Sequence, residues 1–410
     1  MGPSKAITKA ILVLNSGSSS LKYALYNMAS SPACVAKGNV AAIGSSKCSI
    51  THTNLQVAQD MNLQGTAVAD HKSALKRILE LLHLEKEQSD RLYGVGHRVV
   101  HGGEHLTRPM VISEQVKKAI EQASPLAPLH NPPNLEGIRV AEELFHCPQV
   151  AVFDTAFHSS IPSYAYMYAV PYAVYKELGV RRYGFHGTSY QFLLDQAAMY
   201  LGQAKEEVNV IACHLGAGAS MAAIQNGKCI DTTMGVTPLE GLVMATRCGD
   251  IDPAICNILA SQRNLDADQI NHLLNKESGL QGICGEKDMK GILEASEAGS
   301  QIHKLALDVY IHRIRKYLGA YFFHLQGNVD ALIFSGGVGE SSAKIRDMIC
   351  AKLGAFGINI DDAKNHENKT TMRDIQKFDS KVKILVIPTD EELCIAEQTL
   401  GVLEEQKILQ

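Results

Sequence analysis

The sequence predicts an α/β protein built from two similar domains. Residues 11–25 and 208–224 follow one plan: an aliphatic strand, a polar residue, a run of glycine, serine and other small residues, and a second aliphatic strand. Residues 331–352 add an apolar strand, a glycine-rich loop and a helix. Mixed units of this kind indicate an α/β fold, and the repeated plan indicates an internal duplication. Because such folds bind ligands outside the strand ends, we expect a cleft between the domains.

Length and composition fit this expectation. The chain has 410 residues, 46% of them hydrophobic and 20% charged, as in globular proteins of about two domains. A net charge of −4 argues against a general affinity for nucleic acid or for acidic membranes. Ten cysteines without a CxxC pair are typical of reduced thiols. With no apolar leader and no membrane-spanning stretch, we expect a cytoplasmic protein, and a trimmed organelle form stays open.

The opening hairpin is the most informative segment. Strands at 11–14 and 21–25 enclose a loop of serine and glycine, which begins after Asn15 and is followed by Lys22. Small residues let backbone N–H groups and hydroxyls approach a phosphate, and a lysine adds a positive charge. An ordinary serine-rich hairpin turn is the alternative.

Each later element is predicted from the periodicity of its apolar residues and from the glycines or prolines that mark its ends. The apolar stripe of residues 74–82 predicts a helix over 70–84, and prolines predict a stiff loop over 126–133. The other elements expected in the first half are polar strands within 33–57, strands at 93–100 and 149–153, and helices at 113–124 and 135–145.

The second half is interpreted in the same way. An Asn-Gly turn at 226–227 follows the repeated hairpin. The other elements expected are strands at 208–213, 221–224, 331–334 and 383–387, helices at 252–262, 266–275, 300–325 and 342–352, a glycine loop at 335–340 and a closing helix from about 391.

Ten segments together closely resemble the acetate kinase family, within the acetate and sugar kinase/Hsp70/actin superfamily. They cover nearly the whole chain in the family's order. The segments are NSGSSSLKY (15–23), GHRVVHGGE (96–104), APLHNPPN (127–134), FDTAFH (153–158), RYGFHGTS (182–189), HLGAGAS (214–220), MGVTPLEGL (234–242), TRCGDIDP (246–253), GGVGE (336–340) and EEL (391–393).

The resemblance implies two duplicated ribonuclease H-like domains of the actin/Hsp70 ATPase type. Residues 1–156 with 390–410 would form the N-terminal acetokinase domain, and residues 157–389 the nucleotide-binding and dimerisation domain. It also implies a homodimer and reversible, magnesium-dependent transfer of the γ-phosphoryl group from ATP to acetate, giving acetyl phosphate and ADP.

The residues suit that chemistry. Acetate is already ionised at neutral pH, so the obstacle is repulsion between two anions and no general base is needed. Arginine forks bind carboxylate and phosphate oxygens in pairs. The resemblance assigns Arg98 to the acetate carboxylate, Arg247 to the phosphoryl group in flight and His186 to one of its equatorial oxygens. Asp154, after a buried strand, is expected to hold an arginine or the water shell of the metal ion.

The resemblance also implies a slot for the acetate methyl group, a metal site and a nucleotide site. Val100, Leu129, Phe185 and Pro238 would line the slot, with His130 in support. Asn15 and Glu391 would act on Mg²⁺, or Mn²⁺ in its place, directly or through water; Glu391 also suits the start of a helix. Residues expected at the nucleotide and its phosphates are Ser18, Ser20, Lys22, His214, Gly216, Gly218, Asp288, Lys290, Gly336, Gly337, Val338 and Gly339.

Four residues depart from the family pattern: Ala217, Lys290 and Ser341 on the nucleotide side, and Tyr190, where histidine is common. The first three leave pyrophosphate open as the phosphoryl donor. The methyl slot leaves propionate open as the acceptor, because one methylene changes affinity by only about 1–3 kcal/mol. A shape-changing ATP-binding protein of the actin or Hsp70 type is a third class, which paired arginines beside an apolar slot disfavour.

Overall fold

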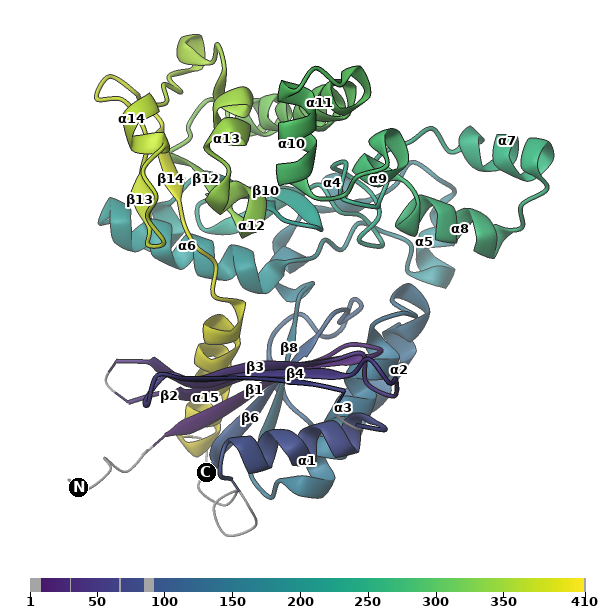
Figure 1. Ribbon diagram of the computed structural model, residues 1–410, viewed down its shortest axis with the longest axis vertical. Helices are drawn as coiled ribbons and strands as arrows, with labels where there is room; N and C mark the ends of the chain where they lie inside the picture. The colour runs from purple at the N-terminus through teal and green to yellow at the C-terminus, as the bar shows by residue number, and fades with distance from the viewer. Residues whose placement is uncertain (1–8, 30, 66–67, 85–91, 409–410) are drawn as a thin grey trace. The chain divides into compact units, whose positions relative to one another are not determined.

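The computed structural model describes residues 9–29, 31–65, 68–84 and 92–408 (Figure 1). The chain divides into two compact units. The first unit is Met1–Phe157 with Asp390–Gln410, and the second unit is His158–Thr389. The expectation that the chain lacks a leader rests partly on residues 1–8, which lie outside the described residues. No helix of the described ranges is both long and apolar enough to cross a bilayer.

The first unit is built on a sheet of eight strands in the order β5-β4-β3-β2-β1-β6-β8-β7. Its strands are β1 (Ala10–Ser16), β2 (Ser20–Asn27), β3 (Ala33–Ala41), β4 (Ser49–Asn54), β5 (Gln59–Gln64), β6 (Leu92–Val99), β7 (Met110–Val111) and β8 (Gln149–Phe153). Its helices are α1 (His71–Leu81), α2 (Glu114–Ala123), α3 (Asn131–Leu144) and α15 (Glu391–Ile408).

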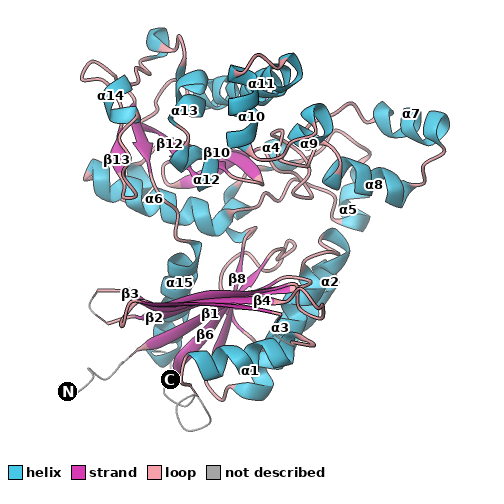
Figure 2. Cartoon of the chain, viewed as in Figure 1, coloured by secondary structure: helices cyan, strands magenta, loops and turns pink. Residues whose placement is uncertain are grey.

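The alternation of side chains along β1 divides the core of this unit in two. Leu12 and Leu14 belong to one cluster, which also contains residues of α1 and α3. Ile11 and Val13 belong to another, which contains residues of α15 such as Ile395. The central strand is therefore covered on both faces, and Figure 2 shows helices on both sides of this sheet.

The second unit is built on a sheet of six strands in the order β11-β10-β9-β12-β14-β13. Its strands are β9 (Val210–Leu215), β10 (Ala219–Gln225), β11 (Lys228–Thr232), β12 (Ala331–Ser335), β13 (Arg373–Asp374) and β14 (Lys383–Val386). Its helices are α4 (Ser163–Tyr166), α5 (Tyr172–Leu178), α6 (Gly187–Leu201), α7 (Ala254–Arg263), α8 (Ala267–Lys276), α9 (Gly279–Cys284), α10 (Met289–Glu297), α11 (Gln301–His324), α12 (Gly336–Ser341), α13 (Ala343–Cys350) and α14 (Asp362–Asn365).

The duplication predicted from the repeated strand plan is confirmed by the strand order. In the first unit β1 pairs antiparallel with β2 and parallel with β6, and β6 pairs parallel with β8. In the second unit β9 pairs antiparallel with β10 and parallel with β12, and β12 pairs parallel with β14. Each sheet also ends in a two-residue antiparallel strand, β7 or β13.

Most predicted elements are confirmed to within a few residues, but two predicted loops are wrong. The loop expected over 126–133 ends early, because α3 already begins at Asn131 with prolines in its first turn. A proline is tolerated there, since the first N–H groups of a helix have no intrahelical acceptor. The glycine loop expected over 335–340 is the short helix α12, and its Gly336 stands at φ +76°.

Several elements were not predicted: β5, β7, β11, β13, α4–α6, α9, α10 and α14. Strand β5 buries none of its residues, and its apolar alternation consists of Met61 and Leu63 alone, which is too short to stand out. Helices α4, α5 and α9 have only four to seven residues each, too few for a helical period to stand out. The ten cysteines all lie within the described residues, and none forms a disulfide.

Candidate active site

In the first unit, Arg98 and Asp154 form a bidentate pair at the ends of neighbouring parallel strands. Arg98 lies near the end of β6, and Asp154 directly follows β8. Arg98 Nε donates to Asp154 Oδ1 at 3.0 Å, and Nη2 donates to Oδ2 at 2.5 Å. The side chain of Asp154 is 1% exposed and that of Arg98 is 21% exposed. The carboxylate therefore fixes the guanidinium plane, as expected of an aspartate that holds an arginine.

Asn15 and Glu391 lie beside this pair. Arg98 Nη1 donates to Asn15 Oδ1 at 3.5 Å, a long contact, and Glu391 begins α15. Burial raises the pKa of Glu391; Arg98 opposes this rise, and Asp154 adds to it. Burial opposes the charge on Arg98, but Asp154 and Glu391 outweigh it and raise the pKa of the guanidinium. Arg98 is thus the one arginine of this cluster, and Asp154, Glu391 and Asn15 surround it with carboxylate and amide oxygens.

The serine-glycine loop of the first unit is held from behind. The backbone N–H of Gly17 donates to the carbonyl of Ser20 at 2.8 Å, and the ring Nε2 of His71 donates to the carbonyl of Gly17 at 2.7 Å. The side chains of Ser18 and Lys22 are exposed, and Ser20 is half-buried. The loop thus presents its hydroxyls and the lysine outward, which fits both a phosphate site and a surface turn.

The segment after β6 carries the residues predicted for the acetate methyl group. The backbone N–H of Val100 donates to Asn134 Oδ1 of α3 at 3.1 Å, and the Val100 side chain is buried. Leu129 is 60% exposed, and the neighbouring His130 is half-buried. A single exposed leucine is common on protein surfaces, so a substrate contact for Leu129 stays a prediction.

In the second unit, two side-chain nitrogens converge on Gly218, in the turn between β9 and β10. The backbone N–H of Gly216 donates to the carbonyl of Gly218 at 3.0 Å, which closes the turn. A Cβ placed on Gly218 would lie 3.5 Å from Arg247 Nη1 and 3.7 Å from His186 Nε2. Only a glycine leaves the space in front of these two side chains open.

His186 and His214 are each placed through the Nδ1 atom. The two rings stack with their centroids 4.3 Å apart. His186 Nδ1 lies 2.8 Å from Ser220 Oγ, and His214 Nδ1 lies 2.9 Å from Ser189 Oγ. His186 has φ +59°, a left-handed conformation that is rare for residues other than glycine and often marks functional positions.

Arg247 differs from Arg98 in having no carboxylate partner among the described residues. Its Nη1 donates to the carbonyl of Pro238 at 3.2 Å, and burial lowers the pKa of its guanidinium. A half-buried arginine without an anionic partner in the protein is suited to an anionic ligand.

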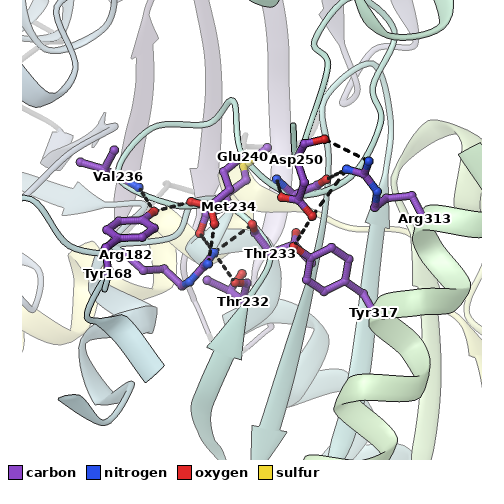
Figure 3. A network of polar contacts seen from close by, with 11 residues as sticks. Tyr168, Arg182, Thr232, Thr233, Met234, Val236, Glu240, Asp250, Arg313 and Tyr317 are labelled. Carbon is purple, nitrogen blue, oxygen red and sulfur yellow. Dashed lines mark hydrogen bonds and ion pairs between the residues drawn. The ribbon is translucent and has the colours of Figure 1, made fainter. Parts of the chain in front are cut away.

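A polar network holds the first part of the loop that carries Arg247 (Figure 3). Arg182 Nη1 donates to the carbonyls of residues 232, 233 and 234, each at 3.0 Å. Arg182 Nη2 pairs with Glu240 at 2.6 Å, and Glu240 also accepts from the hydroxyl of Tyr168. The Tyr168 oxygen accepts from the backbone N–H of Val236 at 3.0 Å. These bonds fix residues 232–240.

Asp250 closes the other end of the loop, as Figure 3 shows. Its Oδ1 accepts from the backbone N–H of Gly241 at 2.8 Å, and its Oδ2 accepts from the hydroxyl of Tyr317 at 2.7 Å. Arg313 donates to the carbonyl of Gly241 at 2.7 Å and to that of Asp250 at 3.0 Å. Arg247 therefore stands on a segment that is tied together at residues 241 and 250.

The glycine-rich α12 lies beside a pocket of about 480 Å³ within the second unit. Glu340 Oε1 accepts from the backbone N–H groups of Gly336 at 2.8 Å and Thr389 at 3.3 Å, which anchors the helix. Gly337 and Ser341 line the pocket. Gly337 is exposed, Val338 is half-buried, and Gly336 and Gly339 are buried.

Three other predicted residues have evident structural roles. Asp288 caps α10 by accepting from the backbone N–H of Gly291 at 3.1 Å. Lys290 is 84% exposed and lies 3.9 Å from Glu294. Phe185 is buried, and its carbonyl accepts from His158 Nε2 at 2.8 Å. A site role for each of the three stays a prediction.

The sequence did not single out Ser220, Glu240 or Asp250. Ser220 is a fully buried polar residue in strand β10, next to the apolar run of residues 221–224, and this contrast was a usable signal. Glu240 and Asp250 are charged residues among glycines and apolar residues, but their partners Arg182 and Arg313 are distant in sequence.

Comparisons with known proteins agree with this arrangement. A model of the acetokinase family matches residues 10–397. The acetate kinase of Oleidesulfovibrio alaskensis is 46% identical over 405 residues, covering 96% of this chain and 99% of that protein. The crystal structure of Porphyromonas gingivalis acetate kinase superposes with a TM-score of 0.90 at 39% identity, over 96% of this chain and 100% of that one. A propionate kinase from Francisella tularensis has a TM-score of 0.89 at 39% identity, with the same coverage.

These likenesses confirm the predicted fold of two duplicated α/β domains. The matched range of residues 10–397 contains both sheets and both groups of side chains described above. The chain belongs to the acetokinase family.

Proposed function

We propose that the chain catalyses reversible transfer of the γ-phosphoryl group between ATP and acetate, as an acetate kinase. The observation that carries the proposal is the convergence of Arg247 Nη1 and His186 Nε2 in front of Gly218. Two nitrogen donors in such a place can neutralise charge on the oxygens of a phosphoryl group during transfer. The family and its named relatives support the same activity.

Arg98 would bind the acetate carboxylate. Asp154 occupies its Nε and one N–H of Nη2, and Nη1 makes only the long contact with Asn15, so the other N–H groups of Nη1 and Nη2 could bind a second anion. Because the acceptor is already ionised, Asp154 would act by orienting Arg98 and not as a base. Val100, Leu129, Phe185 and Pro238 would line the slot for the methyl group, with His130 in support.

The nucleotide would be bound mainly by the second unit. Its phosphates would meet His214, Gly216 and Gly218, and the nucleoside would lie near Gly336–Gly339, Asp288 and Lys290. Ser18, Ser20 and Lys22 of the first unit would contribute phosphate contacts. The domain roles expected from the sequence, the interdomain cleft and the cytoplasmic location stay predictions.

The residues of the first unit fit magnesium. Asn15 and Glu391 offer amide and carboxylate oxygens, the hard ligands that Mg²⁺ prefers, and Asp154 adds a further carboxylate nearby. Burial raises the pKa of Glu391, and the positive charges of Arg98 and Lys22 offset this rise only in part. A bound metal cation would lower that pKa further and favour the ionised carboxylate. Asn15 and Glu391 would hold the ion directly or through water. When bound, the ion would neutralise charge on the phosphate oxygens.

A homodimer is part of the proposal. Helices α4, α5 and α7 of the second unit bury none of their residues. Tyr164, Tyr172 and Leu178 are 87%, 60% and 64% exposed, which is unusual for large apolar side chains close together in the chain. Light scattering after size-exclusion chromatography should give twice the mass of one chain, and a Tyr172→Glu/Leu178→Glu variant should give that of a monomer.

The activity is tested by trapping acetyl phosphate with hydroxylamine. The purified chain is incubated with acetate and either MgATP or magnesium pyrophosphate. We expect product with MgATP, a loss of at least about a hundredfold in Arg247→Ala, and no loss in Arg139→Ala, which removes an exposed arginine on α3. Product with pyrophosphate alone would refute ATP as the donor and assign the departures at Ala217, Lys290 and Ser341 to a changed donor site.

Propionate is the second candidate acceptor. The specific observation in its favour is that a solved propionate kinase is as similar to this chain, at 39% identity, as a solved acetate kinase. One methylene in an apolar slot is worth about 1–3 kcal/mol, so we expect kcat/KM for acetate to exceed that for propionate by roughly tenfold or more. A preference for propionate would overturn the acetate assignment and leave the phosphoryl chemistry intact.

A further inference from the structure

Behind His186 stands a buried chain of two hydroxyl groups. Tyr190, on α6, is fully buried, and its hydroxyl oxygen lies 2.5 Å from Ser220 Oγ on β10. Ser220 is also fully buried, and its Oγ lies 2.8 Å from His186 Nδ1. Phenol, alcohol and imidazole thus form a continuous line of hydrogen bonds that ends at His186. On the other side of the ring, Nε2 faces Gly218.

The direction of this line follows from the donors and acceptors. Burial raises the pKa of the Tyr190 phenol well above its ordinary value of 10. The phenol therefore stays protonated and has a proton that it can donate to Ser220 across the 2.5 Å contact. A phenol is a stronger donor than an alcohol, and imidazole nitrogen is a stronger acceptor, so the order Tyr190 to Ser220 to His186 is the favoured one.

We propose that Tyr190 and Ser220 are positioning residues that hold His186 as the tautomer with its proton on Nε2. The Nδ1 atom then accepts from Ser220, and the Nε2–H group donates toward the space in front of Gly218. The opposite tautomer would turn a lone pair toward the oxygens of a phosphoryl group and repel them. The link to phosphoryl transfer rests on the proposed function, whereas the tautomer is a property of the protein without substrates.

Two features of the surroundings fit a fixed, neutral ring. His186 stacks on His214 at 4.3 Å, and positive charge on both rings at this distance would be unfavourable. The left-handed backbone of His186 costs conformational free energy. Such strain persists where the surrounding structure holds the residue in one orientation. Tyr190 also packs edge-on against the ring of His158, so its position does not depend on the hydroxyl alone.

The first test is kinetic. Tyr190→Phe and Ser220→Ala should each lower kcat by about tenfold to a hundredfold, with KM for acetate and ATP changed by less than about twofold. The double variant should lose no more than the worse single variant, since the hydroxyls act in one chain. Tyr310→Phe is the matched control, because Tyr310 is buried in the same unit and its hydroxyl has no hydrogen-bond partner within the described part of the chain.

The second test reads the tautomer directly. Nitrogen-15 NMR of histidine-labelled protein without substrates should show His186 protonated at Nε2 only, with its signals identified by their loss in His186→Asn. Tyr190→Phe should give a mixture of tautomers, and Tyr310→Phe should not. If Tyr190→Phe fails to fold, Ser220→Ala provides the same comparison.

The outcomes separate cleanly. A proton on Nδ1 in the unmodified protein, or variants that keep both the tautomer and kcat, would overturn the proposal. A changed tautomer without a loss of kcat would overturn its role in the reaction, and a loss of kcat without a changed tautomer would overturn the mechanism. If the unmodified protein makes no acetyl phosphate, the proposed function fails, while the NMR result still decides the tautomer.

Discussion

Arg98 and Asp154 meet through two side-by-side hydrogen bonds, with the carboxylate fully buried and the guanidinium about one-fifth exposed. The pair joins the ends of β6 and β8, so the register of the sheet sets the direction of the arginine fork. A lysine at position 98 could keep the charge but not the planar, two-pronged contact.

Arg98→Lys should therefore raise KM for acetate by at least about tenfold, because the fork would no longer be held in one plane. KM for ATP should change little. Steady-state kinetics with each substrate varied in turn would measure both. Arg108→Lys, at an exposed position of the same unit, is the control and should behave like the unmodified chain. An unchanged KM for acetate would show that Arg98 does not bind the carboxylate.

Gly218→Ala should abolish most activity without unfolding the protein. The added methyl group would be in ordinary contact with Arg247 Nη1 and His186 Nε2, at 3.5 and 3.7 Å, and Gly218 does not have a positive φ. The methyl group would occupy the space in front of both donors, so we expect kcat/KM for ATP to fall by about a hundredfold. Thermal unfolding should change by no more than a few degrees.

Gly319→Ala provides the matched control for that substitution. Gly319 lies in the interior of α11, and nothing stands within 4 Å of the added Cβ. Alanine is favoured over glycine in a helix by about 1 kcal/mol, so this variant should be slightly stabilised and fully active. Full activity in Gly218→Ala as well would show that no ligand passes between Arg247 and His186.

Asp250→Ala should impair catalysis through the loop that carries Arg247. Removing the carboxylate frees Gly241 and Tyr317 and leaves Arg313 without its acidic partner. A displacement of Arg247 by about 1 Å can cost on the order of a hundredfold, so we expect kcat to fall by tenfold to a hundredfold.

Hydrogen exchange should show faster exchange at residues 234–250 of that variant. Asp308→Ala, at an exposed position on α11, should leave both kcat and exchange unchanged. Unaltered kcat in Asp250→Ala, together with faster exchange, would show that the loop need not be held at Asp250 for the reaction.

The stability of the protein should depend on His97 at acidic pH. His97 is buried on β6 and bonds to Gln149 at 2.7 Å, and burial lowers its pKa from 6.5 to about 4. Between these values the unfolded chain binds more protons than the folded one. This contribution to the free energy of unfolding is complete above about pH 6.5 and is lost as the pH falls toward 4, by about 3 kcal/mol in all.

Urea unfolding between pH 7.5 and 4.5 would measure this effect as a difference between variants. His97→Gln should lose less stability than the unmodified chain as the pH falls, because glutamine does not titrate. His105→Gln, at an exposed position, should follow the unmodified chain. Parallel curves for all three proteins would contradict the prediction.

The sequence was sufficient for elements with a strong apolar period. Residues 11–14 and 150–153 are continuous apolar runs, and the structure forms β1 and β8 there. The prolines after Asn131 predict a loop, but in the first turn of a helix they are compatible with one. Short helices such as α9 depend on tertiary packing, and a single sequence does not reveal that packing.

The site was predictable where the residues that form it can be recognised from the strands that they follow or end. Arg98 and Asp154 each end an apolar strand, and parallel strands bring such ends together. The partners of the Arg247 loop were not predictable, since Arg313 and Tyr317 lie on α11, far along the chain. Ser220 and Tyr190 likewise meet only because β10 and α6 pack together.

Helix α15 belongs to the first unit, although the whole second unit precedes it in the chain. It packs on β1, β6 and β8 and covers the face of the sheet that includes Ile11 and Val13. During synthesis on the ribosome, the second unit can therefore complete its core before the first one does. Until α15 has been synthesised, the face of the sheet that includes Ile11 and Val13 is not covered by this helix. Glu391 is the first residue of α15, so it is added with the same segment. The unit that is translated first is thus the last to receive its full set of residues, and its uncovered apolar face is a surface that a chaperone could bind.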